Sequence, residues 1–543
     1  MSSNAYSAGG FDAGTVAQAL FPLERFSQAD TIADATRAHA LNAQLPTQPA
    51  APNKTAPENG SDGSVGFADA LLPPSLTDLG NAQLFASREG RNFRFVDGIG
   101  WLVWDTYRWD RREGESRAKW AAAHMGQALA DADPRGLFNP VELRKHKRNA
   151  MSNSGIRNML ALAQSSPDLR LDPGQLDSGR YVLCTPAGIV DLQQATLRPA
   201  DPARDFNSRA TAVSPAAMPT PRWHGFLTQS FGEDEEGREM IEYLQRLLGY
   251  AITGDTGAQI LPFLFGKGSN GKSVLVNVLR QLLGDYADAA PPGFLMERQF
   301  SEHSTELTEL QGRRIIICTE LNQDDKFDEA RVKLLTGQDN IKARRMRQDY
   351  AVSFRPTHCL LLVGNHRPSV RNGGFAFWRR IRLIPLDRVV PNNKKIDNLD
   401  RILIEEEGPG ILMWLIQGAA LYLQNRDSLT GPARVQVATD GYEADENFVG
   451  RFIEECCVTS SDRRVEQGLL YQAYCAWSEE EDTAVVTSRD FSKRMRAELG
   501  LASPKDMPKA NGARYYPAIG LEERYKAAGT ARLAVFRAAQ RRT

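Results

Sequence analysis

The sequence predicts an α/β protein whose central region lies between an N-terminal α+β region and a smaller C-terminal region. Three observations support this fold class. Residues 260–390 alternate short apolar runs with helical patterns, which is typical of a layered sheet. A glycine-rich segment near residue 270 separates one such run from a helix. The chain of 543 residues is also longer than one core usually holds, so we expect two or three domains.

Composition shifts along the chain set the domain boundaries. Residues 45–65 are dense in proline, alanine and small polar residues, which predicts a flexible arm. Residues 91–110 have the pattern of short strands with aromatic packing, and residues 181–193 that of two strands around a Pro-Ala-Gly turn. The predicted regions are a flexible arm, an α+β domain, a central strand–helix domain and a C-terminal domain with a basic tail, at 1–75, 76–225, 226–430 and 431–543.

The overall charge excludes little. The chain has 66 basic and 67 acidic residues and a formal net charge of -1, so any DNA-binding surface must be a local patch. Its 6 cysteines include no C-x-x-C pair, which argues against a zinc finger. The N-terminus lacks a secretory pattern, and no apolar run approaches the ~20 residues of a membrane span. We therefore expect a cytoplasmic protein without membrane association.

Residues 266–273 read GKGSNGKS and match the pattern G-x-x-x-x-G-K-[ST]. An apolar run precedes them and helical spacing follows, which gives the required order of strand, loop and helix. Such a loop binds phosphate oxygens with backbone N–H groups at a helix N-terminus. Lys272 is expected to reach the β and γ phosphates of ATP, and Ser273 to bind Mg²⁺. The predicted nucleotide-binding residues are Gly266, Gly268, Ser269, Asn270, Gly271, Lys272, Ser273 and Val274.

Two later apolar runs end in polar residues. Glu320 follows one run and is expected to hold Mg²⁺ through water or to polarise the attacking water. Asn365 follows the next and is expected to hydrogen-bond the γ-phosphate and that water, although a turn asparagine near Pro368 is the alternative.

The sequence FWRRIRLI, which comes next, contains two adjacent arginines, Arg379 and Arg380. An arginine from a neighbouring subunit can stabilise charge on the transferring phosphoryl group. We favour Arg380 for this role, with Arg379 next, against the alternative that both are surface or packing residues.

The ordered motifs GKGSNGKS, IIICTEL, KLLTGQDNIKARRM, LLLVGNHRP and FWRRIRLIPL resemble the superfamily 3 helicases of phage and plasmid primase–helicases, over roughly residues 91–520. The resemblance implies an AAA+-like P-loop ATPase core that assembles as a homo-hexamer around single-stranded DNA. It also implies ATP between subunits, translocation from 3′ to 5′, and a winged-helix-like C-terminal domain. Arg489, Lys493, Arg494 and Arg496 lie on or near the helix where recognition is expected; a packing or lid domain with solvated cations is the alternative.

The family's additional motif leads into a hairpin that points into the ring channel. Residues 331–355 of this chain are locally basic, and cations in a channel grip phosphates without reading sequence. We expect Lys342, Arg345 and Arg347 to contact DNA; a solvated charge run is the alternative.

Two features depart from the family. Leu321 follows Glu320 where relatives often have a second acid, so Asp324 and Asp325 stay candidates to assist hydrolysis. Too few ordered residues precede the motor for a polymerase-like primase domain, so we expect no primase activity and a separate primase or loader as a partner.

The expected function is an ATP-dependent DNA helicase acting on single-stranded and forked DNA in phage or plasmid replication, in a bacterial host cell. The alternative is an initiator or loader that uses ATP as an assembly switch and unwinds little. A P-loop small-molecule kinase would need an acceptor-binding lid and leaves the basic hairpin unexplained.

Overall fold

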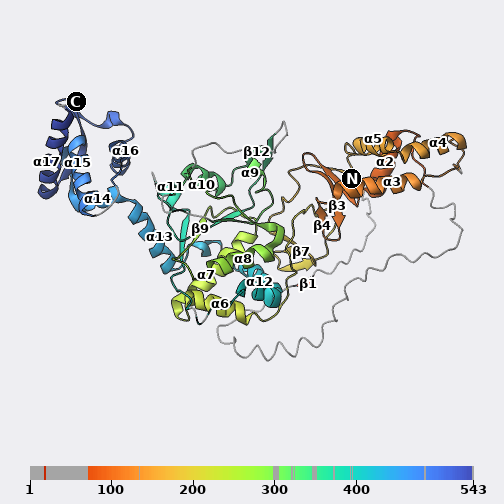
Figure 1. Cartoon of the computed structure of the whole chain (residues 1–543), viewed down its shortest axis with the longest axis horizontal. Helices are drawn as coiled ribbons and strands as arrows, with labels where there is room; N and C mark the ends of the chain where they lie inside the picture. Colours follow the sequence, from red (N-terminus) through yellow and green to blue (C-terminus); the bar gives the residue numbers. More distant parts are fainter. Residues whose placement is uncertain are drawn as a thin grey trace, which may run out of the picture.

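Five parallel strands form the central sheet of the protein (Figure 1). In this computed structural model the described residues are 18–19, 71–133, 135–297, 305–319, 322, 325–344, 351–370, 373–391, 393, 395–481 and 485–540. The strands lie in the order β10 (Ala287–Ala289), β11 (Ile315–Cys318), β14 (Cys359–Gly364), β9 (Leu261–Phe265) and β15 (Ile381–Pro385). The predicted alternation of strands and helices over 260–390 is therefore confirmed.

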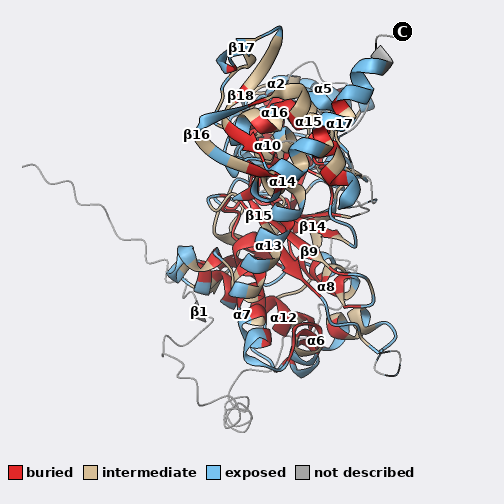
Figure 2. Ribbon diagram, turned by 90° about the vertical axis from the view of Figure 1, so that its left-hand side faces the viewer, coloured by how far each residue is buried: buried red, intermediate tan, exposed pale blue. Residues whose placement is uncertain are grey.

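Both faces of this sheet are buried, which is why its strands read as continuous apolar runs rather than alternating patterns. Figure 2 shows β9, β14 and β15 in the buried colour. Alternate residues of one strand enter different cores: Ile315 and Ile317 pack on one side, Ile316 and Cys318 on the other. The first side is covered by α7 (Glu235–Ile252), α8 (Lys272–Leu283) and α12 (Leu399–Gln424).

The second face is covered by shorter elements. They are α10 (Glu329–Leu335), the antiparallel pair β12 (Ile341–Arg344) and β13 (Ala351–Phe354), and α11 (Phe375–Trp378). Ile341 and Ala343 of β12 are buried in this core while Lys342 and Arg344 point outward. The pair is thus anchored by one face of each strand.

The N-terminal region has a helical part and two small sheets. Its elements are α2 (Asp78–Glu89), β2 (Phe93–Val96), β3 (Gly100–Asp105), β4 (Arg108–Asp110), α3 (Gly114–Gln127), α4 (Pro140–Ala150), α5 (Asn153–Ala163), β5 (Arg170–Leu171), β6 (Val182–Thr185), β7 (Gly188–Asp191) and β8 (Thr196–Arg198). The strands expected around Trp101 and around the Pro-Ala-Gly turn are both present.

The two small sheets pack differently. Trp101 and Val103 belong to a core of the N-terminal region itself. Leu183 and Val190, from β6 and β7, belong instead to the core under the central sheet, together with residues of α7 and α12. Of the predicted arm, only Gln18–Ala19 and residues from 71 onward are described; Gln18–Ala19 form β1, which pairs with β8.

The C-terminal region is joined to the central one through α13 (Ala433–Glu446), which packs on β15 and leads outward in Figure 1. The helix α6 (Pro221–Phe231) belongs to the central region, where it packs against α7 and α12. The C-terminal region has its own core, which includes Phe452, Trp477 and Phe491. Its main elements are α14 (Phe448–Cys456), β16 (Cys457–Glu466), α15 (Gln467–Glu480), α16 (Ser488–Glu498), β18 (Ala513–Leu521) and α17 (Glu523–Gln540).

The predicted basic tail forms α17, and its cations are paired within the chain. Arg532 makes a double ion pair with Glu479 on α15, at 2.6 and 2.8 Å, and Arg537 pairs with Glu466. Arg541 and Arg542 lie outside the described residues. Among the described helices, none has both the length and the apolar character needed to cross a bilayer.

Candidate active site

The glycine-rich loop connects β9 to α8, and two of its glycines lie where a side chain would clash with neighbouring atoms. Gly271 precedes the first residue of α8 with φ of 85°, and a Cβ added there would lie 2.8 Å from the Phe226 ring. At Gly266, an added Cβ would lie 2.0 Å from the side chain of Asn270. A side chain at either position would displace the loop, so the backbone path itself depends on these glycines.

Lys272 is the cation at the base of this loop. Its Nζ donates to the carbonyl oxygen of Gly266 at 2.7 Å and to Oδ1 of Asn270 at 2.9 Å. Asn270 in turn donates from Nδ2 to the carbonyl oxygen of Leu386 at 2.6 Å. Lys272 is only 7% exposed, and this burial lowers its pKa. Both acceptors are neutral, so the ammonium keeps a full charge for an anion entering the loop.

A cavity of about 400 Å³ opens over the loop. Of the predicted nucleotide-binding residues, it brings together all except Gly266, which lies beneath the loop. Its other walls come from α6 and from the segment that precedes α12. They are Phe226, Gln229, Val390, Lys395, Ile396, Asp397, Asn398 and Leu399. A cavity of this size, with backbone N–H groups and one buried cation at its floor, suits a compact polyphosphate.

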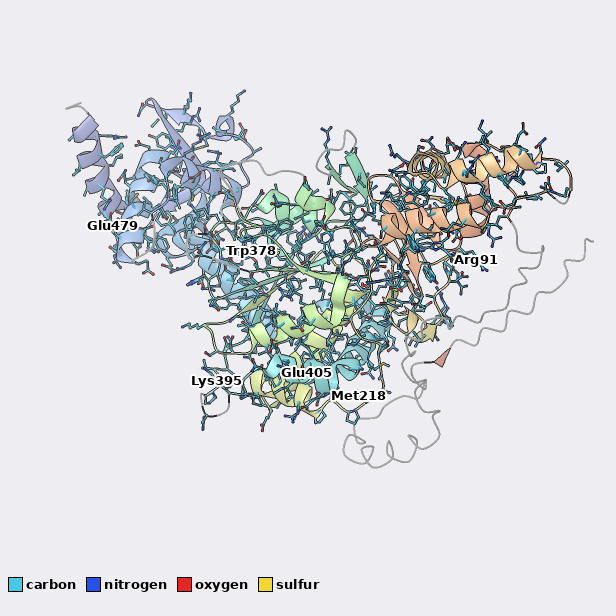
Figure 3. The ribbon with its side chains drawn as sticks, turned by 45° about the vertical axis from the view of Figure 1, so that its right-hand side comes forward. Arg91, Met218, Trp378, Lys395, Glu405 and Glu479 are labelled. Atoms are coloured by element: carbon cyan, nitrogen blue, oxygen red, sulfur yellow. The ribbon has the colours of Figure 1, made fainter. Side chains whose placement is uncertain are left out.

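No sequence pattern singles out the residues of this second wall. Lys395 stands at the outer side of the central region (Figure 3), and its Nζ lies 3.5 Å from Oγ of Ser269. Asn398 has φ of 54° at the start of α12. The polar run PNNKKID was a signal for a loop, but only the fold places it opposite residues more than a hundred positions earlier.

Asn365 also lines the cavity. It directly follows β14, which lies between β9 and β11 in the sheet. The carboxyl ends of parallel strands share one edge, so the glycine-rich loop, Asn365 and the residue after Cys318 all meet there. Glu320, which comes two residues after Cys318 in the sequence, lies outside the described residues, as do Leu321 and Asp324. The Asp325 carboxylate accepts the backbone N–H of Asn322 at 2.8 Å.

Ser273 stands in the first turn of α8 with its side of the helix on the cavity. A hydroxyl beside a polyphosphate is a suitable ligand for a Mg²⁺ ion that keeps several waters and phosphate oxygens. Within the described residues, no cluster of three or more histidine, cysteine or acidic side chains forms a closed metal site. Ser273 and Glu320 stay the predicted metal ligands.

Arg379 and Arg380 differ sharply in their surroundings. Arg380 is 7% exposed, donates from Nε to Oγ1 of Thr336 at 3.0 Å and bonds the carbonyl oxygen of Ala376. Burial lowers its pKa, and the charge of Arg379 adds to this effect. Arg379 is exposed, with a hydrogen bond to the side chain of Gln259. Neither residue lines the cavity over the loop.

Of the predicted DNA-contacting residues, Lys342 lies on the β12–β13 pair. Lys342 is exposed on β12, beside Arg344 on the same face. Arg345 and Arg347 fall in the connection between the two strands and lie outside the described residues. The hairpin geometry expected for this segment is thus present up to Arg344 and from Ala351 onward.

A joint behind the site ties β9 and β14 to the C-terminal region. The Arg367 guanidinium pairs with Asp445 at 2.8 Å and stacks on Phe265 and Tyr442, at 5.7 and 5.3 Å from the ring centres. The Glu446 carboxylate accepts the Val370 N–H at 2.8 Å. Trp378, which Figure 3 places between the two regions, packs on Tyr442 with ring centres 5.1 Å apart.

Arg494 is part of this joint. It donates to the carbonyl oxygens of Val370 at 2.9 Å and Glu446 at 3.2 Å, and lies 4.2 Å from the Phe448 ring centre. Burial lowers its pKa. Of the four cations expected near a recognition helix, Arg489 and Lys493 are exposed, whereas Arg494 fastens α16 to the central region.

Two stretches of the chain match known families. Residues 82–232 match the family described as "D5 N terminal like", and residues 264–380 match a family of unknown function (DUF5906). Together they span most of the N-terminal region and the central sheet.

Curated relatives come from large DNA viruses. The chain is 25% identical over 244 residues to "Putative helicase L207/L206" of Acanthamoeba polyphaga mimivirus, covering 43% of this chain and 25% of the relative. It is 25% identical over 342 residues to "Putative helicase 184R" of Invertebrate iridescent virus 6, covering 56% of this chain and 35% of the relative. The chain thus spans between a quarter and about a third of the length of these two relatives.

Among solved structures, the A form apo structure of the NrS-1 C terminal region aligns with a TM-score of 0.41 at 11% identity, over 78% of this chain and 95% of that one.

The fold and the site define the class: an α/β protein with a glycine-rich loop and a cavity at the carboxyl edge of a parallel sheet. The D5 N-terminal-like match and the viral relatives named putative helicases support the phage-type primase–helicase family that the ordered motifs resemble.

Proposed function

We propose that this chain is an ATP-dependent DNA helicase of phage or plasmid replication, using Mg²⁺ as cofactor. The single observation that carries the proposal is the cavity in which the loop, Lys272, Ser273 and Asn365 converge. The D5 N-terminal-like match and the names of the viral relatives support the same function. By family resemblance, we further propose a hexameric ring around single-stranded DNA that moves from 3′ to 5′, in a bacterial host cell.

In this proposal, the loop binds the phosphates of ATP with its backbone N–H groups. Lys272 exchanges its two neutral acceptors for phosphate oxygens, and its charge is strengthened by the low local dielectric. Mg²⁺, held by Ser273 and Glu320, would neutralise developing phosphate charge. Asn365 would position the attacking water from the neighbouring strand end.

We assign the arginine that acts across the subunit boundary to Arg379 rather than Arg380. A residue that reaches a neighbouring subunit's ATP must stand at the surface, and Arg379 does. Arg380 would have to leave a buried position and two hydrogen bonds to Thr336 and Ala376, at a cost of roughly 1 to 3 kcal/mol for each unpaired buried group.

The test is strand displacement of a 3′-tailed and a 5′-tailed duplex, with ATP and Mg²⁺. The wild type is compared with Lys272→Ala and with the matched control Lys267→Ala. Lys267 lies in the same loop but is exposed and does not line the cavity. We expect Lys272→Ala to lose ATP hydrolysis about 100-fold or more, because a single preorganised charge partner contributes this much in a closed site, and Lys267→Ala to stay active.

The outcomes separate the candidate functions. Unwinding of the 3′-tailed substrate only, lost in Lys272→Ala, supports the helicase and its polarity. Hydrolysis without unwinding of either substrate favours an ATP-switched initiator or loader. Equal hydrolysis by Lys272→Ala and the wild type would overturn the assignment of the loop.

A further inference from the structure

A second polar cavity, of about 370 Å³, lies at the opposite edge of the central sheet. Its walls come from Ile99, from β4 with residues 111–112, from the connecting segment at 208–209, and from residues that precede β10 and β11. Asp285 stands two residues before β10 and Arg313 two residues before β11. The cavity is therefore at the amino edge of the sheet, between the N-terminal and central regions.

The lining of this cavity is strongly basic. It includes five arginines and three carboxylates: Arg108, Arg111, Arg112, Arg209 and Arg313 against Asp110, Asp285 and Glu309. One carboxylate, Asp285, is already paired with Arg108. Another, Asp110, accepts the backbone N–H of Arg112 at 2.8 Å. Arg313 is paired with Asp288, which does not line the cavity. The lining itself has five arginines against three carboxylates, and we call this pocket the arginine cavity.

Buried contacts fix the floor of the arginine cavity. Arg209 is 7% exposed, and its guanidinium donates to the carbonyl oxygens of Gln311 at 2.9 Å, Asp285 at 3.2 Å and Glu309 at 3.5 Å. Its backbone N–H donates to Oδ1 of Asp177 at 3.1 Å. Burial lowers the pKa of Arg209 to about 10; Asp177 opposes this shift, and the charges of Arg313 and Arg111 add to it. The cations thus repel one another, and an anion that enters between them would relieve this repulsion.

Two arginines at the rim are available to such an anion. Arg111 and Arg112 are both exposed. Within the part of the chain that the structure describes, neither guanidinium has an ion-pair partner. A guanidinium presents its N–H groups as a planar fork that matches phosphate oxygens, so this is an arrangement for a phosphate group rather than for a cation or an apolar ligand.

The arginine cavity lies beside the β12–β13 pair. The short helix α9 (Thr305–Thr308) connects them: Thr305 donates from Oγ1 to the carbonyl oxygen of Arg344 at 3.4 Å, while Glu309, next after α9, lines the cavity. β13 also leads into the amino end of β14. Both basic features therefore face the same edge of the sheet.

From this placement, we propose that the arginine cavity binds a phosphodiester group of single-stranded DNA, as a second contact next to the β12–β13 pair. The proposal rests on the proposed function only in taking DNA as the polymer. It assigns the junction between the N-terminal and central regions to the DNA path, with Arg111 and Arg112 as the contacting side chains and Arg108, Arg209 and Arg313 as their fixed support.

The test compares the full chain with Arg111→Ala/Arg112→Ala. A charge-matched control is Arg238→Ala/Arg401→Ala, which removes two exposed arginines from α7 and α12 that line neither cavity. Binding of a fluorescent oligothymidylate is measured by anisotropy without nucleotide, at several salt concentrations. We expect the rim variant to bind about tenfold more weakly at low salt and its log–log salt slope to fall by about 0.7, which is the contribution of one phosphate contact with a single strand.

The control should bind as the wild type does, and hydrolysis of ATP without DNA should be unchanged in both variants. Equal DNA affinity and equal salt slope in the rim variant would overturn the proposal. A second experiment measures thermal stabilisation by inorganic pyrophosphate in the Lys272→Ala variant, with and without the two rim substitutions. If the rim substitutions abolish this stabilisation but leave DNA binding intact, the cavity holds a free polyphosphate and the proposal is overturned. DNA binding is measured without ATP. The test of the arginine cavity therefore gives an answer even if the chain does not unwind DNA.

Discussion

The two cavities lie at opposite edges of one sheet and offer different kinds of donor to an anion. At the carboxyl edge, the glycine-rich loop offers backbone N–H groups and a single buried lysine, Lys272. At the amino edge, the arginine cavity offers side-chain cations from three segments. The strand β14 runs between them: Asn365 follows its carboxyl end, and Thr357, before its amino end, donates to the carbonyl oxygen of Arg313 at 3.0 Å.

The difference suits two kinds of anion. Backbone donors on a loop that cannot change its path fit one compact ligand in one orientation, as a reacting phosphate requires. Long arginine side chains at an open rim tolerate a polymer that shifts between positions. The comparison therefore predicts that changes at the first edge affect turnover, while changes at the second affect affinity and its dependence on salt.

The largest effect is expected for Arg379→Ala. If Arg379 completes the first cavity of a neighbouring subunit, its loss should slow hydrolysis by about 10³-fold and leave nucleotide binding intact. Mixing Arg379→Ala with Lys272→Ala subunits should restore part of the hydrolysis, because each supplies what the other lacks. Arg380→Ala should instead lower the stability of the fold. A mixture as inactive as its components would place Arg379 outside the active site.

Acid should weaken the sheet that both cavities share. His358, at the amino end of β14, is 2% exposed, and its burial lowers its pKa from 6.5 to about 4, with a small opposing contribution from the Leu335 backbone. Between these pH values the unfolded chain binds a proton that the folded chain does not. Stability is therefore complete above pH 6.5 and falls as the pH drops toward 4, by about 3 kcal/mol in all.

Urea unfolding at several pH values in this range measures how the free energy of unfolding depends on pH. His358→Gln should lose most of this dependence. His366→Gln, which replaces an exposed histidine just beyond the other end of β14, should keep it. An unchanged pH dependence in His358→Gln would assign the acid sensitivity to other groups.

Adding a single Cβ to the glycine-rich loop should change ATP affinity without changing DNA binding. Gly271→Ala places the new atom 2.8 Å from the Phe226 ring at φ of 85°, whereas Gly268→Ala, at φ of 107°, meets nothing within 4 Å. We expect ATP affinity to fall about 30-fold or more in the first variant and about tenfold in the second, where only backbone strain of about 1 to 2 kcal/mol acts. Isothermal titration gives these values. DNA binding without nucleotide should be normal in both; its loss would mean that the edges are not independent.

The smallest effect is expected on the β12–β13 pair. Lys342→Ala should weaken DNA binding several-fold and lower the salt slope by about 0.7, as one lost phosphate contact does for single strands. Lys119→Ala, on α3 and paired with Glu115, is the control. When Lys342→Ala is combined with Arg111→Ala/Arg112→Ala, the losses in DNA-binding free energy of the separate variants should add. Strong non-additivity would indicate that the hairpin and the arginine cavity bind DNA in alternative ways.

The site at the carboxyl edge of the sheet could be predicted from the sequence because most of its residues are close together in the chain. A strand, a glycine-rich loop and the first turn of a helix are consecutive, so Lys272 and Ser273 carry their own context. Asn365 could be placed as well, because a polar residue at the end of an apolar run marks a strand end. Neighbouring strands then bring such ends together.

What the sequence did not predict depends on tertiary contacts. Arg379 and Arg380 are adjacent and chemically identical, and only the fold buries one against Thr336. Arg494 has the spacing of a recognition-helix cation but bonds the carbonyl oxygen of Val370 across the joint. The arginine cavity joins residues near positions 110, 209 and 313, which no local pattern connects.

The joint behind the site has a mechanical consequence. The helix α13 is 14 residues long, or about 21 Å at the usual rise per residue. Near its middle, Thr439 accepts the N–H of Leu383 on the edge strand β15, and near its end Asp445 and Glu446 hold the segment that follows Asn365. A tilt of about 10° about its first turn would carry the far end through about 4 Å. Because α13 is held both to β15 and to the segment after β14, a shift at the carboxyl end of β14 would reach the C-terminal region through this helix.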